Sequence, residues 1–140
     1  MKVKIIKMDY SIYTDGGSRG NPGPSGAGGI IINQEGFVIE EISEYLGRQT
    51  NNYAEYMALL LTLQRAVKLN IKSVKIFMDS ELIVKQMKGE YKVKNESLKV
   101  INLQIVELLK LFENVTFTHV YREHNKHADS LVNKAIDKFI

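Results

Sequence analysis

Four carboxylates stand where the hydrophobic patterns of the sequence start or stop. Asp15 and Asp79 each end an apolar segment, whereas Glu55 and Asp129 lie near the start of amphipathic segments. Functional side chains of α/β proteins gather beyond strand ends and at helix starts, so folding can bring these four acids to one place. Clustered carboxylates repel one another unless cations neutralise them. The pattern therefore predicts a divalent metal site.

The ligand type predicts which metal and which reaction such a site serves. Mg²⁺ takes few protein oxygens and keeps water and substrate phosphate oxygens in its shell. Two such ions about 4 Å apart activate a water and stabilise the leaving oxygen of a phosphodiester. The sequence has no Cys, and His124 and His127 lack the further ligands of a zinc site, so we interpret both as solvated loop residues. Phosphodiester hydrolysis is the predicted reaction.

Composition indicates one globular domain spanning residues 1–140, with 44% hydrophobic and 25% charged residues. The net charge of +3 and the pI near 9.0 permit a nucleic-acid partner. Four of the 16 acids are assigned to the metal cluster, which leaves the remaining surface more basic than the net charge suggests. A polyanionic substrate is therefore compatible with the chain.

The first seven residues contain only a two-residue apolar run, Ile5-Ile6, between lysines. This is too short for a signal peptide or a membrane anchor. We expect a cytoplasmic protein with no membrane partner, and we expect it to be a monomer.

Hydrophobic periodicity predicts the element order βββαβααβα, which is an α/β fold. The predicted strands cover about 10–15, 28–33, 37–46, 74–78 and 115–121, and the helical stripes run over 56–67, 80–89, 98–112 and 128–139. Residues 16–29 hold most of the glycines and both prolines; we interpret them as a turn-rich loop, because they lack the Gly-Lys-Ser/Thr ending of a phosphate cradle. Three antiparallel strands followed by crossovers predict a five-stranded mixed sheet flanked by helices.

The acids are embedded in four motifs that occur together and in order. They are Tyr-Thr-Asp-Gly-Gly at 13–17, Gly-Arg-Gln-Thr-Asn-Asn-Tyr-Ala-Glu at 47–55, Met-Asp-Ser at 78–80 and Asn-Lys-His-Ala-Asp-Ser-Leu-Val-Asn at 125–133. With them the chain resembles a type 1 ribonuclease H from about Tyr10 to Ile136. The resemblance implies the ribonuclease H-like fold and an endoribonuclease that cuts the RNA strand of RNA/DNA hybrids, leaving a 5′-phosphate and a 3′-hydroxyl.

The resemblance also implies roles for individual residues. Asp15, Glu55, Asp79 and Asp129 would bind two Mg²⁺ ions, with Mn²⁺ as a substitute. The implied substrate contacts are Arg48, Thr50 and Asn95 at a DNA-strand phosphate, Asn21, Asn51 and Asn52 in the minor groove, and Gly16 and Glu55 at ribose 2′-hydroxyls. Contacts to phosphates and 2′-hydroxyls distinguish RNA from DNA without reading bases, so we expect cleavage that is largely independent of sequence.

Two features depart from larger family members. The loop before the last helix is short, and both Arg122 and His124 are candidates for the auxiliary catalytic role that many relatives give to a loop histidine. The basic protruding helix of larger relatives is reduced here to the segment 88–94, which retains three lysines. We therefore expect a weaker grip on the substrate.

Two alternative functions remain at the level of sequence. The first is a related nuclease of the same fold that acts on double-stranded RNA or on DNA junctions, although the segment 48–52 matches hybrid recognition. The second is a catalytically silent hybrid-binding module. Such a module would predict the loss of one or more acids, and all four are present.

Overall fold

A five-stranded mixed sheet forms the centre of the computed structural model, which describes residues 8–140. The N-terminal segment 1–7, where we expected neither a signal peptide nor an anchor, lies outside the described residues. The strands are β1 (Asp9–Ser18), β2 (Gly23–Ile32), β3 (Val38–Gln49), β4 (Ser73–Met78) and β5 (Asn114–His119). The helices are α1 (Asn51–Lys68), α2 (Glu81–Met87), α3 (Glu96–Leu109) and α4 (Lys126–Asp137), with a 3₁₀ turn, η1, at Arg122–His124.

The strand order β3-β2-β1-β4-β5 confirms the predicted topology. β1 pairs antiparallel with β2 and β2 with β3, whereas β4 runs parallel to both β1 and β5. Parallel pairing needs crossover connections, and here α1 leads into β4 while α2 and α3 connect β4 to β5. The predicted order βββαβααβα is therefore confirmed, apart from the added turn η1.

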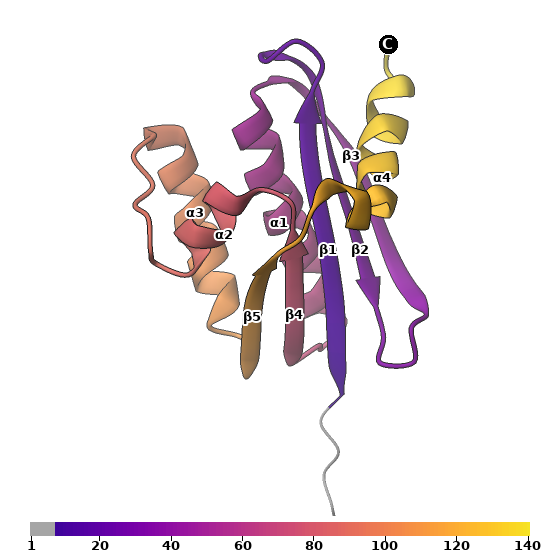
Figure 1. Cartoon of the computed structure of the whole chain (residues 1–140), viewed down its shortest axis with the longest axis vertical. Coiled ribbons are helices and arrows are strands. Elements are labelled where there is room, and N and C mark those ends of the chain that lie inside the picture. Colours follow the sequence, from indigo (N-terminus) through magenta and orange to yellow (C-terminus); the bar gives the residue numbers. More distant parts are fainter. Residues whose placement is uncertain (1–7) are drawn as a thin grey trace, which may run out of the picture.

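Helices cover both faces of the sheet, with α1 behind it and α4 in front of it in Figure 1. Adjacent residues of β2 show the same division, because the α-carbon hydrogen of Gly28 faces α4 and that of Gly29 faces Thr62 of α1. The main core lies between α1, α3 and the sheet, where Ile12, Leu59 and Ile76 are fully buried. Each such side chain contributes about 1.5–3 kcal/mol through removal of apolar surface from water.

The prediction of a loop over 16–29 is wrong. β1 continues to Ser18, β2 begins at Gly23, and only residues 19–22 connect them. Glycine usually weakens a strand, which is why the segment was interpreted as a turn, but here the glycines allow helices to approach the sheet closely. A Cβ on Gly16 would lie 2.2 Å from the backbone of Ala54 in α1, and one on Gly28 would lie 2.3 Å from the Ala128 carbonyl oxygen in α4.

Several element ends also differ from the expectations. β5 ends at His119 rather than at 121, and α4 ends at Asp137, so Phe139 is 60% exposed and stacks on Tyr45 at 4.7 Å instead of entering the core. His127 is not a loop residue: it lies in the first turn of α4, with its Nε2 2.5 Å from an oxygen of Glu41 on β3. Among residues 8–140 no helix combines the length and the apolar character needed to cross a membrane.

Candidate active site

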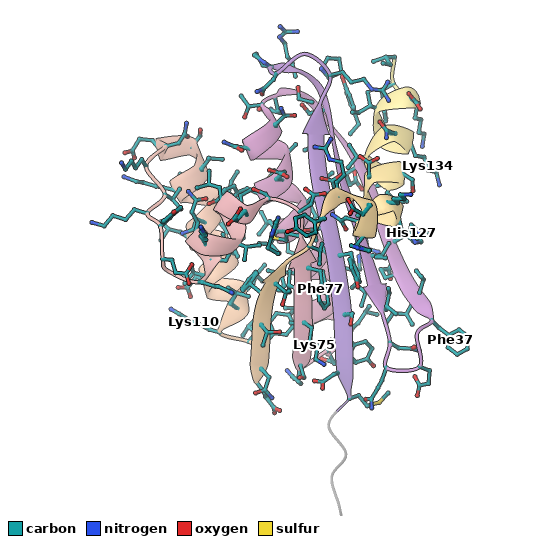
Figure 2. The ribbon with its side chains drawn as sticks, in the orientation of Figure 1. Phe37, Lys75, Phe77, Lys110, His127 and Lys134 are labelled. Atoms are coloured by element: carbon teal, nitrogen blue, oxygen red, sulfur yellow. The ribbon has the colours of Figure 1, made fainter. Side chains whose placement is uncertain are left out.

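Asp15 and Asp79 lie side by side because β1 and β4 are parallel neighbours. Thr14 pairs with Met78 in this register. Asp15 and Asp79 follow these two residues directly, so they come next to each other at the same end of the sheet. Both preceding side chains are buried in the core, and the alternation of strands therefore directs the two carboxylates to the opposite side. Tyr13 and Phe77 stand two residues before the acids and therefore point to the same side, where their rings stack at 4.7 Å. Figure 2 shows Phe77 further along β4 than Lys75, toward the end that carries the acid.

Glu55 reaches the same point from α1. The helix begins after Thr50, whose side-chain oxygen accepts a hydrogen bond from the Tyr53 N–H at 3.2 Å. The close contact between Gly16 and the Ala54 backbone holds this turn against β1. As a result, one oxygen each of Asp15, Glu55 and Asp79 lie within 4.8 Å of one another.

Asp129 completes the cluster from the first turn of α4. Its side chain forms a hydrogen bond with that of Asp15. The approach of α4 to Gly28, which pairs with Asp15 in the sheet, brings the two together. All four predicted acids therefore meet, one from each of β1, α1 and α4 and one directly after β4.

The cluster is electrostatically unfavourable as four free anions. Burial, together with the charges of Asp79, Glu55 and Asp129, raises the pKa of Asp15 to about 8. Burial, and then the charge of Asp79, raises the pKa of Glu55 to about 8, against an opposing hydrogen bond from Ser80 and the charge of Arg122. An all-oxygen donor set with raised pKa values fits hard divalent cations, because such ions remove the repulsion that raises them.

The structure separates the two candidates for the auxiliary role. The charge of Arg122 lowers the pKa of Glu55. His124, in the same turn, lines a cavity of about 240 Å³ with Tyr13, Ile30 and His127, and none of the four carboxylates lines it. The short turn η1 thus directs Arg122 and His124 to different places.

Most of the predicted substrate residues surround one cavity of about 510 Å³, beside the N-termini of α1 and α3. The lining includes Asn21, Thr50, Asn51, Asn52 and Asn95. Arg48 is exposed on β3 two residues before Thr50 and does not line this cavity. Helix N-termini present unpaired N–H groups and partial positive charge, which favour an anion.

Local hydrogen bonds fix which atoms these side chains offer. The Asn51 N–H donates to Asn21 Oδ1 at 2.9 Å, and the Ser18 N–H donates to Asn51 Oδ1 at 2.8 Å. Asn95 caps α3, with its Oδ1 accepting from the Leu98 N–H at 3.1 Å. Because each oxygen is occupied by a backbone donor, the amide NH₂ groups remain to bind acceptors.

Asn125 is a site residue to which sequence reasoning assigned no role. It is 1% exposed, and its Nδ2 donates to the Thr14 carbonyl at 2.9 Å and to Asp79 Oδ2 at 3.0 Å. Its own carbonyl oxygen accepts the Asp129 N–H at 3.1 Å. The side chain of Asn125 therefore connects β1 with Asp79, and its backbone belongs to the start of α4. Its signal in the sequence is its place as the first residue of the motif at 125–133, four residues before Asp129.

Comparison with known proteins agrees with this geometry. The family model described as reverse transcriptase-like matches residues 13–135. The bifunctional protein Rv2228c of Mycobacterium tuberculosis is 41% identical over 93% of the chain, and the ribonuclease HI of Halobacterium salinarum is 38% identical over 89%. The chain spans only 36% and 63% of the lengths of these two relatives.

Solved structures show the same arrangement. The crystal structure of LC11-RNase H1 in complex with an RNA/DNA hybrid has a TM-score of 0.87 and 45% identity, covering 92% of this chain and 97% of the other. Fold and site together define a ribonuclease H-like domain with its carboxylate cluster intact. The motifs, the family match and the relatives place it more narrowly: the chain belongs to the type 1 ribonuclease H family.

The raised pKa values predict how stability depends on pH without divalent cations. The folded chain keeps protons on Asp15 and Glu55 up to about pH 8, whereas the unfolded chain releases them near pH 4. The free energy of unfolding should therefore fall as pH rises from about 4 to about 8. At pH 8 in EDTA we expect Asp15→Asn to melt about 5 °C or more above the wild type, while the exposed control Glu35→Gln should not differ. Equal melting temperatures of Asp15→Asn and wild type would contradict this electrostatic account.

Removal of the Asn125 amide should weaken metal binding. In Asn125→Ala, Asp79 loses a donor that orients it, and we expect the Mg²⁺ affinity measured by titration calorimetry to fall about 10-fold or more. The variant should also lose about 1–3 kcal/mol of stability, because the Thr14 carbonyl loses a buried hydrogen bond. Asn102→Ala on α3 is the matched control. Wild-type Mg²⁺ affinity in Asn125→Ala would show that the contact does not position Asp79.

Proposed function

We propose that this chain is a divalent-metal-dependent endoribonuclease that hydrolyses the RNA strand of RNA/DNA hybrids to 5′-phosphate and 3′-hydroxyl products. The observation that carries the proposal is the convergence of Asp15, Glu55, Asp79 and Asp129 beside a cavity lined by neutral hydrogen-bond donors. The LC11 relative, whose structure contains a hybrid, supports the substrate class.

The four carboxylates would hold two Mg²⁺ ions, with Mn²⁺ as a substitute. When bound, the ions neutralise the cluster, lower the pKa of an attacking water and stabilise the leaving oxygen of the phosphodiester. Two neighbouring side chains keep the carboxylates in place: Asn125 donates to Asp79, and Ser80 hydrogen-bonds Glu55.

Arg122 is the auxiliary residue that we infer, because its charge acts on Glu55 and lowers the pKa of that carboxyl. Its fixed positive charge can stabilise the negative charge that develops on the scissile phosphate. His124 stays an alternative from the sequence, but its side chain lines a cavity apart from the carboxylates.

The cavity between α1 and α3 suits a phosphate of the DNA strand. The Thr50 hydroxyl, the Asn95 amide and two helix N-termini supply donors, and Arg48 on β3 adds charge at the periphery. The outward NH₂ groups of Asn21 and Asn51, together with Asn52, suit acceptors in the minor groove. Glu55 is the acceptor we assign to a ribose 2′-hydroxyl. The Gly16 N–H already donates to Asp15 Oδ1 at 3.0 Å, so a substrate contact of Gly16 stays a prediction.

Double-stranded RNA is a second candidate substrate, because it shares the 2′-hydroxyls and the groove shape of a hybrid. A silent hybrid-binding module is less well supported, since the four acids converge. A single domain over 1–140, the monomeric state and the cytoplasmic location stay predictions from the sequence.

A panel of labelled duplexes tests the proposed function. With Mg²⁺ or Mn²⁺ the wild type should cut the RNA strand of a hybrid, and it should leave DNA duplexes and single strands whole. Asp79→Asn should lower the cleavage rate about 1,000-fold or more while hybrid binding, followed by fluorescence anisotropy, changes little. An intact hybrid in the wild-type reaction would end the proposal. If the wild type cut only double-stranded RNA, that duplex would replace the hybrid as the proposed substrate.

The two loop candidates are distinguished by paired variants. At saturating Mg²⁺ we expect Arg122→Ala to lower kcat on the hybrid about 10- to 100-fold, because the positive charge beside the reacting phosphate is lost. His124→Ala, the matched variant in the same turn, should keep kcat within about twofold of wild type. The reverse order of the two effects would assign the auxiliary role to His124.

A further inference from the structure

Tyr56 places a phenol in the centre of the core, one residue after Glu55. Its side chain is fully buried, and its hydroxyl donates a hydrogen bond to Gln86 Oε1 at the end of α2. A buried hydroxyl without a partner costs free energy, so this pairing holds the Gln86 amide in one orientation.

The other end of the same amide reaches the connection between α2 and α3. Gln86 Nε2 donates to the Lys92 carbonyl at 3.3 Å. We call residues 88–95 the basic segment; it forms the loop at the left of Figure 1. Gln86 thus connects α1, which carries Glu55, to the middle of this loop through a single side chain.

Other contacts hold the basic segment on either side of Lys92. The N–H groups of Glu90 and Tyr91 both donate to the Lys85 carbonyl, at 2.9 and 3.3 Å, and the Lys85 ammonium lies 5.1 Å from the Tyr91 ring. Further along, Val93 packs against the core and Asn95 caps α3. Lys92 lies between these two groups of contacts, and its carbonyl is held by the hydrogen bond from Gln86.

The basic segment also forms a wall of the predicted substrate site. A groove of about 550 Å³ is lined by Gln86, Lys92 and Lys94, and it shares Asn52, Asn95 and Leu98 with the cavity between α1 and α3. A shift of Lys92 would therefore move Asn95 and the lysines relative to α1. Binding is stronger when such a wall is ordered before the ligand arrives.

We propose that Gln86 is a positioning residue for substrate binding: through Tyr56 it holds the basic segment against α1, so that the substrate cavity is formed before the duplex binds. This inference rests on the proposed function. It explains how a chain with only a short connection in this region presents a defined surface to a duplex.

Three variants and a control test this role. Gln86→Leu removes both hydrogen bonds at similar volume, and Tyr56→Phe removes only the hydroxyl. The double variant Tyr56→Phe/Gln86→Leu pairs two apolar groups in the core but leaves the Lys92 carbonyl without its donor. Gln104→Leu, on the exposed surface of α3, is the matched Gln-to-Leu control. The measurements are KM and kcat on the hybrid, the melting temperature, and amide hydrogen exchange of residues 91–95 in the free protein.

We expect Gln86→Leu to raise KM about five- to tenfold, the effect of one hydrogen bond, with kcat within twofold and faster exchange of residues 91–95. The double variant should regain melting temperature relative to Gln86→Leu but keep the raised KM. A KM that returns to the wild-type value together with stability would show a purely structural role and overturn the proposal, as would unchanged exchange in Gln86→Leu. Failure of the proposed function is distinguishable, because the wild-type chain itself would then leave the hybrid uncut.

Discussion

Repulsion among carboxylates held close together in a partly buried place is the constraint on which the rest of this structure depends. One oxygen each of Asp15, Glu55 and Asp79 lie within 4.8 Å of one another. Burial and mutual charge raise the pKa values of Asp15 and Glu55 to about 8. The surrounding fold must hold acids that would otherwise move apart, and two devices do so: close helix–strand contacts at glycines, and the hydrogen bonds of Asn125. The same repulsion makes divalent cations the natural occupants.

A second constraint organises the surface beside the acids. Polar side chains around the cavity between α1 and α3 use their oxygens to accept backbone N–H groups, so the atoms that remain are donors. Donors near two helix N-termini favour phosphate without selecting a base sequence. The Tyr56–Gln86–Lys92 connection extends this order to the basic segment. The acids that we propose as cation ligands and the donors that we propose as phosphate contacts thus belong to neighbouring parts of the molecule.

Hydrophobic periodicity was sufficient to predict most helices and strands, because each element buries one stripe of side chains regardless of which elements pack against it. The 3.6-residue stripe of α1 and the alternation of β4 both matched the structure. The glycine-rich segment 16–29 was misjudged for a physical reason: glycine weakens a strand locally, and the compensating contact comes from helices distant in the chain. The prediction for Phe139 failed because the apolar stripe of the sequence continues past Asp137, where α4 ends.

By itself the sequence determined the element order, the four acids and the residue types that line the substrate cavity, because local patterns and motifs encode them. Only the tertiary structure decided that the charge of Arg122 acts on Glu55 and that none of the four acids lines the cavity at His124. It also decided that Asn125 donates to Asp79 and that Gln86 donates to the Lys92 carbonyl. These contacts join residues that belong to different elements, or depend on how a short turn directs neighbouring side chains. Hydrophobic periodicity cannot predict these contacts, because they are set by how the sheet and its helices pack together.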